Sequence, residues 1–292
     1  MINISHLNYK YSGSNEIVLK DISFKVNPKT ITGIIGPNGS GKTTLMKLLS
    51  GLLLPDDFSE FDTGKDGEIA LILGENQLYM DLTAFENIRY YLLLNKLRRK
   101  KDEILDVLSK VGLNGTENIL VSKFSTGMKQ KLNIAKVMLS QKKIIILDEP
   151  TSGLDPLSKL EVSQLLRNIQ MSEENTILIT SHSMKEVQYI CDDILFINNG
   201  MQIFNGSKTE LFGKYKKRVT ELHASENFIK KEMNYAKSMH MKFYIRMLEN
   251  ESIIVINGIC ACDEENSYSE IIVRDINLED IFLFETIGEQ NV

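Results

Sequence analysis

The segment from Gly36 to Thr43 constrains the fold of this chain of 292 residues more than any other feature. It reads G-P-N-G-S-G-K-T and matches the pattern G-x-x-x-x-G-K-[ST]. A β-branched run ending at Ile35 precedes it, and leucines at helical spacing follow it as far as Gly51. We therefore predict a strand, a tight loop and a helix, in that order, with a phosphate-binding loop at the junction.

The composition of this loop suits phosphate binding. Glycines let successive backbone N–H groups approach phosphate oxygens, and the helix N-terminus adds partial positive charge. Lys42 would supply a cation for the β and γ phosphates, and the Thr43 hydroxyl a ligand for Mg²⁺. The alternative is a glycine-rich turn that matches by accident. The predicted binding residues of the loop are Gly36, Pro37, Asn38, Gly39, Ser40, Gly41, Lys42, Thr43 and Thr44.

A second pattern is an apolar run, residues 144–147, that ends in two acidic residues, Asp148 and Glu149. By itself this pattern is weak, because many strands end in aspartate. Together with the upstream loop it predicts nucleotide hydrolysis, in which Asp148 holds Mg²⁺ and Glu149 polarises the attacking water.

The first two thirds of the chain alternate strand-like and helix-like patterns, which indicates an α/β fold with a largely parallel sheet. Three runs are almost continuously apolar, as strands covered on both faces are: residues 30–35, 143–147 and 176–180. Helices are predicted at 83–98, where Thr83 and Glu86 form a capping box, and at 156–171.

The pattern changes after about residue 212. Asn199-Gly200 predicts a hairpin turn just before this point. A basic cluster, Lys214 to Arg218, is interpreted as a solvated stretch, with contact to anionic headgroups as the alternative. Beyond it we predict helices at 226–240 and 277–287 and strands at 242–248 and 252–256.

Charge and composition exclude several classes of protein. The formal net charge of −5 offers no basic excess to neutralise nucleic acid phosphates. No apolar run reaches the 18–20 residues, roughly, that span a bilayer, and the N-terminus does not resemble a signal peptide. Three cysteines in a long chain fit free thiols in a reducing cytosol. We predict a cytoplasmic protein that does not bind nucleic acid.

Three further motifs carry a family resemblance, at residues 123–130, 150–155 and 180–182. With the two motifs above, their order resembles that of the ATP-binding-cassette (ABC) transporter ATPases, across residues 2–210. The resemblance implies the ABC variant of the P-loop NTPase fold: a mainly parallel core sheet, an antiparallel edge region and a helical subdomain at about 76–140. We predict an ATPase domain over 1–212 and a small accessory α/β region over 213–292.

By this resemblance, residues 124–128 form the signature loop, 152–155 the D-loop, and His182 the switch histidine. Two ATPase subunits would face each other head to tail and hold ATP and Mg²⁺ between them. Ser125 and Gly127 would reach the γ-phosphate across that interface, and Asp155 would belong to the nucleotide site. The catalytic residues would be Lys42, Glu149 and His182. For His182 a structural role is the alternative.

The family resemblance also implies roles for two further residues, Tyr11 and Glu75. Tyr11 would stack on adenine, with core packing as the alternative. Glu75 would replace the Q-loop glutamine and help bind Mg²⁺ and nucleotide, with Gln77 as the competing alignment. Thr126 and Met128 also depart from the commonest signature loop, and the stretch from 55 to 75 is short, so its antiparallel edge is expected to be trimmed.

The departures and the ending at 277–282 resemble the subfamily whose membrane partners are of the ABC-2 type. We therefore predict a peripheral ATPase subunit that powers a separate permease at the cytoplasmic face of the membrane. Export of a drug, antibiotic, peptide or lipid-like substrate is favoured. Residues 82–91 and the Q-loop would form the groove that receives a coupling helix of the permease. Homodimer and heterodimer remain open. The alternative is a soluble ABC ATPase acting on ribosomes or DNA.

Overall fold

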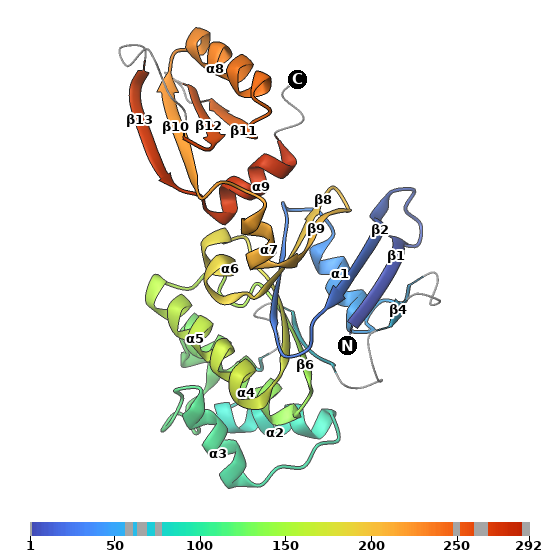
Figure 1. Ribbon diagram of the computed structural model, residues 1–292. Helices are drawn as coiled ribbons and strands as arrows, with labels where there is room; N and C mark the ends of the chain where they lie inside the picture. The colour runs from blue at the N-terminus through green and yellow to red at the C-terminus, as the bar shows by residue number, and fades with distance from the viewer. Residues whose placement is uncertain are drawn as a thin grey trace. The chain divides into compact units, whose positions relative to one another are not determined.

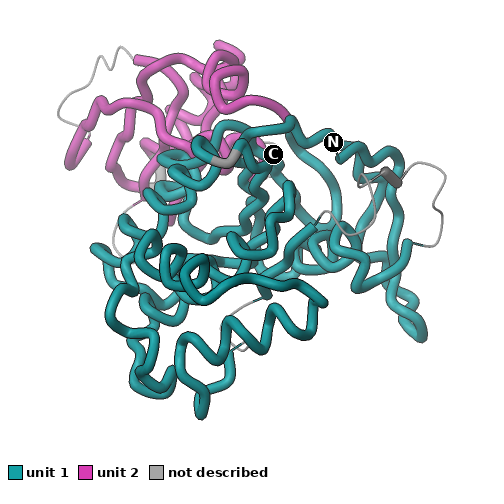
Figure 2. The backbone as a smooth tube through the Cα atoms, turned by 90° about the horizontal axis from the view of Figure 1, so that it is seen from below, with its two compact units in different colours: residues 1–205 teal, residues 206–292 magenta. Residues whose placement is uncertain are grey.

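The computed structural model describes residues 2–55, 61–62, 69–73, 78–247, 252–259 and 268–287. The chain divides into two compact units, residues 1–205 and residues 206–292, which Figure 2 colours separately. Among the described residues, no helix has the length and hydrophobicity that crossing a bilayer requires.

A six-stranded sheet forms the centre of the first unit (Figure 1). Its strand order is β5-β6-β7-β3-β8-β9, and the ladders from β5 to β8 are parallel. The strands are β3 (Ile31–Ile35), β5 (Ile69–Leu73), β6 (Ile144–Asp148), β7 (Thr176–Thr180), β8 (Asp193–Asn198) and β9 (Met201–Ser207). The mainly parallel sheet and the three apolar strands predicted from the sequence are thereby confirmed.

Two tight turns in this unit follow from local sequence. Asn199 and Gly200 both have positive φ, 50° and 78°, as the predicted two-residue hairpin turn between β8 and β9 requires. Helix α1 (Lys42–Leu49) ends just before Gly51, whose φ of 76° is left-handed. Both predictions are confirmed, and the short β3–α1 connection is where the phosphate-binding motif lies.

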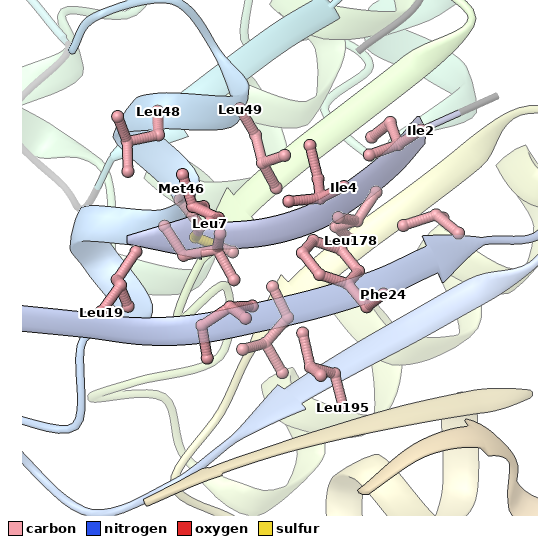
Figure 3. Packing of buried hydrophobic residues seen from close by; sticks show 14 of the residues in the cluster. Ile2, Ile4, Leu7, Leu19, Phe24, Met46, Leu48, Leu49, Leu178 and Leu195 are labelled. Carbon is pink, nitrogen blue, oxygen red and sulfur yellow. The ribbon is translucent and has the colours of Figure 1, made fainter. Parts of the chain in front are cut away.

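An antiparallel sheet packs against α1 and the core sheet. Its order is β2 (Ile17–Val26), β1 (Ile2–Lys10) and β4 (Phe61–Asp62). Figure 3 shows side chains from these layers together, including Ile4, Phe24, Leu49, Leu178 and Leu195. In this buried cluster, α1 packs against both the antiparallel sheet and the core sheet. This packing fixes the position of α1 and of the phosphate-binding loop that precedes it. Residues 56–60 and 63–68, most of the stretch expected to be trimmed, lie outside the described residues.

Helices make up most of the segment between β5 and β7. They are α2 (Ala84–Leu94), α3 (Lys101–Lys110), a 3-10 turn (Val121–Lys123), α4 (Thr126–Ser140) and α5 (Pro156–Glu173). The capping box at Thr83 and Glu86 is confirmed. The predicted end of this first helix at 98 is wrong, because the chain leaves the helix at Asn95 and Lys96 takes a left-handed φ of 56°.

The second unit contains a four-stranded antiparallel sheet of order β11-β12-β10-β13. Its elements are α7 (Lys208–Gly213), β10 (Arg218–Ala224), α8 (Glu226–Ser238), β11 (Phe243–Met247), β12 (Ser252–Asn257), β13 (Tyr268–Asp275) and α9 (Leu278–Thr286). Both helices beyond the basic cluster, and β11 and β12, lie close to their predicted ranges. Strands β10 and β13 were missed, because charged residues interrupt their apolar alternation.

A charged network in this unit joins the sheet to α9. The buried Tyr244 hydroxyl donates to an oxygen of Asp280 at 2.8 Å, and the Arg274 guanidinium donates to both Asp280 oxygens at 2.7 and 2.8 Å. Burial raises the pKa of Asp280, but these bonds and the Asn277 N–H outweigh it and leave the pKa below its ordinary value. The four exposed residues of the basic cluster, Lys214, Lys216, Lys217 and Arg218, agree with the solvated interpretation.

Candidate active site

The phosphate-binding loop lies at the carboxyl end of β3, the edge where parallel sheets place their ligands. A Cβ atom on Gly36 would lie 2.0 Å from the Ile197 carbonyl oxygen, so only glycine fits beside β8. Gly39 and Gly41 have φ values of 78° and 101°, which bend the loop back towards α1. The loop therefore forms a cradle of backbone groups at the N-terminus of α1.

Lys42 is held inside this loop. Its ammonium donates to the carbonyl oxygens of Gly36 and Pro37 at 2.8 and 2.9 Å. Burial lowers the pKa of Lys42, and the charges of Glu149 and Asp148 act in the opposite direction. The Lys42 side chain thus connects the first residues of the loop to α1, and its charge interacts with those of Asp148 and Glu149.

The acidic pair lies across from the loop at the end of β6. An Asp148 carboxylate oxygen is 3.4 Å from the Thr43 hydroxyl. The other oxygen accepts a 2.6 Å hydrogen bond from the Thr180 hydroxyl, and that hydroxyl accepts at 2.9 Å from the Glu149 backbone N–H. Thr180 therefore positions both acids. Sequence reasoning did not assign this role, although Thr180 ends the next parallel strand and so reaches the same edge.

Glu149 and His182 meet at this edge. The carboxylate of Glu149 contacts the Nε2 atom of His182, which lies on the loop between β7 and α6 (Met184–Ile190). Glu149 has a φ of 49°, a left-handed conformation that costs a non-glycine residue free energy. The fold holds Glu149 in this strained conformation with its carboxylate on the imidazole.

A half-buried carboxylate on α6, also missed from the sequence, joins the two loops around this pair. One oxygen of Glu186 accepts from the Thr151 hydroxyl at 2.6 Å and from the Ser181 hydroxyl at 2.9 Å. Thr151 follows Glu149 on one loop, and Ser181 precedes His182 on the other. A cavity of about 270 Å³ lies beside them, lined by Glu149, Thr151, Ser152, Gly153, Lys159, Ser181, His182, Ser183 and Glu186.

Tyr11 directly follows β1 and lies near the other end of the phosphate-binding loop. Its hydroxyl is 3.0 Å from the Thr44 hydroxyl, and its ring meets the Tyr9 ring edge to face at 5.3 Å. The side chain is 37% exposed. An aromatic ring that is partly exposed beside α1 is available for a planar ligand.

The signature and D-loop residues lie together and are held mainly by helix capping. Ser125 caps α4 and accepts from the Met128 N–H at 3.2 Å. Asp155 caps α5 by accepting from the Ser158 hydroxyl and N–H and from the Leu157 N–H, and these bonds lower the pKa of Asp155. Gly127 packs against Ser158, where an added Cβ would lie 3.1 Å from its hydroxyl.

None of the described hydrogen bonds joins Ser125, Gly127 or Asp155 to residues 36–44. The structure therefore brings together Lys42, Thr43, Asp148, Glu149 and His182, with Tyr11 and Thr44 on the flank, and among the described residues it shows no hydrogen bond from the signature loop to the phosphate-binding loop. Glu75 and its alternative Gln77 lie outside the described residues.

The residues fit a nucleotide phosphate with Mg²⁺. The Ser40 hydroxyl is buried and has no hydrogen-bond partner among the described residues, in the middle of the glycine cradle. Buried polar atoms almost always have partners, and a phosphate oxygen in the cradle would supply one for this hydroxyl. The Thr43 hydroxyl and the Asp148 carboxylate are the oxygen ligands that Mg²⁺ prefers, and they face each other beside the cradle.

Fold and site together define a P-loop nucleotide hydrolase with an α/β core. A family model described as ABC transporter matches residues 19–152. The chain is 36% identical over 217 residues to the lantibiotic transport ATP-binding protein SrtF of Streptococcus pyogenes, covering 70% of this chain and 93% of SrtF. It is 34% identical to the ABC transporter ATP-binding protein NatA of Bacillus subtilis, covering 73% and 92%.

Among solved structures, cbiO1 of Clostridium perfringens, part of the ABC transporter complex cbiONQ, aligns with a TM-score of 0.63 and 25% identity. The alignment covers 82% of this chain and 96% of cbiO1. The chain belongs to the family of ABC transporter ATP-binding proteins, and it is an ATP-binding, ATP-hydrolysing subunit of such a transporter. The family membership and the fold class predicted from the sequence are confirmed.

Proposed function

We propose that this chain powers a separate membrane permease that exports an antibiotic, drug, peptide or lipid-like compound, and that two ATPase subunits clamp ATP between them. The proposed ATPase domain covers 1–212 and the accessory region 213–292. Relatedness to a subunit named for lantibiotic transport supports export. A permease of the ABC-2 type, and peripheral placement of this chain at the cytoplasmic face of the membrane, belong to the same proposal.

Within one chain, the residues of this site would supply both nucleotide binding and activation of the attacking water. Residues 36–44 would cradle the phosphates through backbone N–H groups, with Lys42 as the balancing cation. Thr43 and Asp148 would hold Mg²⁺, which supplies positive charge to the phosphates. Glu149 would accept a proton from the attacking water, and His182, already against Glu149, would contact the γ-phosphate.

The observation that supports the clamp is that no described hydrogen bond joins the signature loop to the phosphate-binding loop of the same chain. The N-terminus of α4 presents backbone N–H groups, of which the Met128 N–H is satisfied by Ser125. Such a helix end suits a phosphate, yet its residues make no described bond to residues 36–44 of their own chain. A second subunit in head-to-tail orientation would bring Ser125 and Gly127 to that phosphate, beside Asp155.

The test is ATP-dependent association of the purified chain. Glu149→Gln keeps volume and hydrogen bonding but removes the base, so with Mg·ATP we expect it to accumulate as a dimer in light scattering. Lys42→Ala is the matched control and should show no increase in mass when Mg·ATP is added, because it lacks the phosphate cation. Full ATPase activity of Glu149→Gln would refute the role of Glu149 as base, and the absence of any Mg·ATP-dependent increase in mass would refute the clamp.

The proposed permease contact lies on α2. A cavity of about 570 Å³ borders this helix and is lined in part by Tyr90 and Leu93, whose side chains are 39% and 72% exposed. Leu94, the last residue of the helix, is 62% exposed. Three arginines, Arg89, Arg98 and Arg99, line the cavity with one acid, Glu86. Exposed leucines beside cations suit an amphipathic helix from a membrane partner.

Two experiments test the partner. A photo-crosslinker at Phe85, which is half-buried on the first turn of α2, should capture a membrane subunit in cells, whereas the same probe at Met171 on α5 should not. Affinity purification in detergent should recover the same membrane protein, and its sequence would assign the permease type. Recovery of ribosomes or DNA instead of a membrane protein would contradict the transport role.

A further inference from the structure

Strand β13 forms one edge of the sheet in the second unit (Figure 1). It pairs with β10 on one side, and no described strand pairs with its other side. Natural proteins protect such edges with proline, lysine, bulges or a covering element, because unpaired backbone groups recruit other strands. From Glu270 to Asp275 the strand contains neither proline nor lysine, and its ladder with β10 is regular.

The side chains of this edge alternate between apolar and charged. Ile271 and Val273 are 39% and 43% exposed. They stand opposite Leu222 and Thr220 of β10 and therefore share a face with Leu222. Glu270, Ile272 and Arg274 occupy the other face. An edge with exposed apolar residues on one face and two opposite charges on the other restricts which strand can pair with it.

The order of these side chains is self-complementary. If β13 pairs antiparallel with β13 of a second copy about Ile272, Glu270 meets Arg274 and Ile271 meets Val273. Opposite charges and β-branched pairs across antiparallel strands are both stabilising. Centring the pair on residue 270 would instead oppose two glutamates, and centring it on residue 274 would oppose two arginines. Among the registers centred on residues 270, 272 and 274, charge therefore favours the one centred on Ile272.

Both charged groups are prepared for this contact. Arg274 is held in place by Glu221, which accepts from Nε at 3.0 Å, and by the two bonds to Asp280. One Nη group also donates to the Asp275 carbonyl oxygen at 3.4 Å, so these four bonds leave one Nη hydrogen of the five guanidinium hydrogens for a further acceptor. The Glu270 side chain is exposed and has no described ion-pair partner. A glutamate from a second copy would meet a cation that is already ordered.

We propose that β13 is the docking edge for a second copy of this chain, and that it joins the two four-stranded sheets into one continuous sheet. The contact needs no nucleotide and lies in residues 206–292, so it is separate from the ATP clamp. It favours two identical ATPase subunits over a heterodimer. A contact made by one strand from each chain is weak alone. Its contribution to affinity would increase if the same two chains were also held together by a second contact.

The first test is disulfide crosslinking of the full chain without nucleotide. Cys260 and Cys262 are replaced by serine, which leaves Cys191, a buried thiol. Ile272→Cys should then form a dimer, because residue 272 faces itself across the pair. Val273→Cys should not, because its own copies lie diagonally, about 7–8 Å apart, beyond disulfide reach. Mixed Ile271→Cys and Val273→Cys chains should crosslink with each other.

The second test is the charge pair itself. In sedimentation at concentrations up to about 100 µM, Glu270→Lys should weaken self-association about tenfold, because two attractive pairs become repulsive. Glu16→Lys makes the same charge change on an exposed loop of the first unit and should leave association unchanged. Absence of self-association, equal crosslinking of the 272 and 273 variants, or crosslinking of Ile272→Cys only to a permease would overturn the proposal.

Discussion

Thr180 offers the sharpest test of how the fold supports hydrolysis, because its hydroxyl serves both acids at once. Thr180→Val keeps the shape of the side chain and removes a hydrogen bond to Asp148 and another from the Glu149 N–H. A hydrogen bond to a charged group contributes about 1.5–3 kcal/mol, and an unpaired buried N–H costs about 1–3 kcal/mol. Because the two effects overlap, we expect the free energy of unfolding to fall by about 3 kcal/mol.

Activity should fall as well, since both carboxylates lose their fixed positions. Misplacement of a reacting group by about 1 Å reduces rates about 100-fold, so we expect kcat to fall by that order while KM for ATP changes little. Thr180→Ser keeps the hydroxyl and should restore most of the lost rate. A loss of stability alone would not lower kcat at an unchanged KM in protein that remains folded at the assay temperature.

The neighbouring strand provides a matched control. Thr32 on β3 is also buried, but its hydroxyl has no hydrogen-bond partner among the described residues. Thr32→Val should therefore leave activity unchanged and raise the free energy of unfolding by about 1 kcal/mol. The measurements are urea unfolding followed by circular dichroism, and steady-state ATPase kinetics. The reasoning would be refuted if Thr180→Val matched the wild type in kcat, or if both valine variants behaved alike.

Three further substitutions probe separate parts of the molecule. Tyr11→Ala should raise KM for ATP several-fold with little change in kcat. Tyr11→Phe should keep the wild-type KM, because stacking on adenine needs only the ring. Equal effects of the two variants in ATPase kinetics would contradict stacking. Gly36→Ala should abolish nucleotide binding in fluorescence titration, because its Cβ would collide with backbone 2.0 Å away, whereas Gly213→Ala, with nothing within 4 Å, should bind normally. Asp280→Asn should destabilise the second unit by about 3 kcal/mol near pH 7, since it breaks a buried pair with Arg274. Because the folded-state pKa of Asp280 is lowered, its stabilising contribution is present above about pH 4 and is lost as pH falls through the folded value, so the difference in unfolding midpoints should shrink in acid.

Local sequence predicted much of the scaffold because the decisive interactions there are short-range. The apolar runs at β3, β6 and β7 can be buried on both faces only in a covered parallel sheet. The capping box at Thr83 and the turn at Asn199-Gly200 depend on residues one to three positions apart. The end of α2 was less predictable, because Lys96 takes a left-handed conformation that its residue type does not favour.

The amino-acid sequence by itself determined which residues form the phosphate-binding loop, which acids end β6 and which family these motifs define. Each of these depends on residues that are contiguous in the chain. Only the tertiary structure revealed that Thr180 bonds Asp148 and Glu149, that Glu186 joins Thr151 to Ser181, and that β13 lies at an edge. The partners in three of these hydrogen bonds are 31 to 35 residues apart, and Ser181 is five residues before its partner Glu186 in α6. Strand order follows from long-range packing that no local pattern encodes.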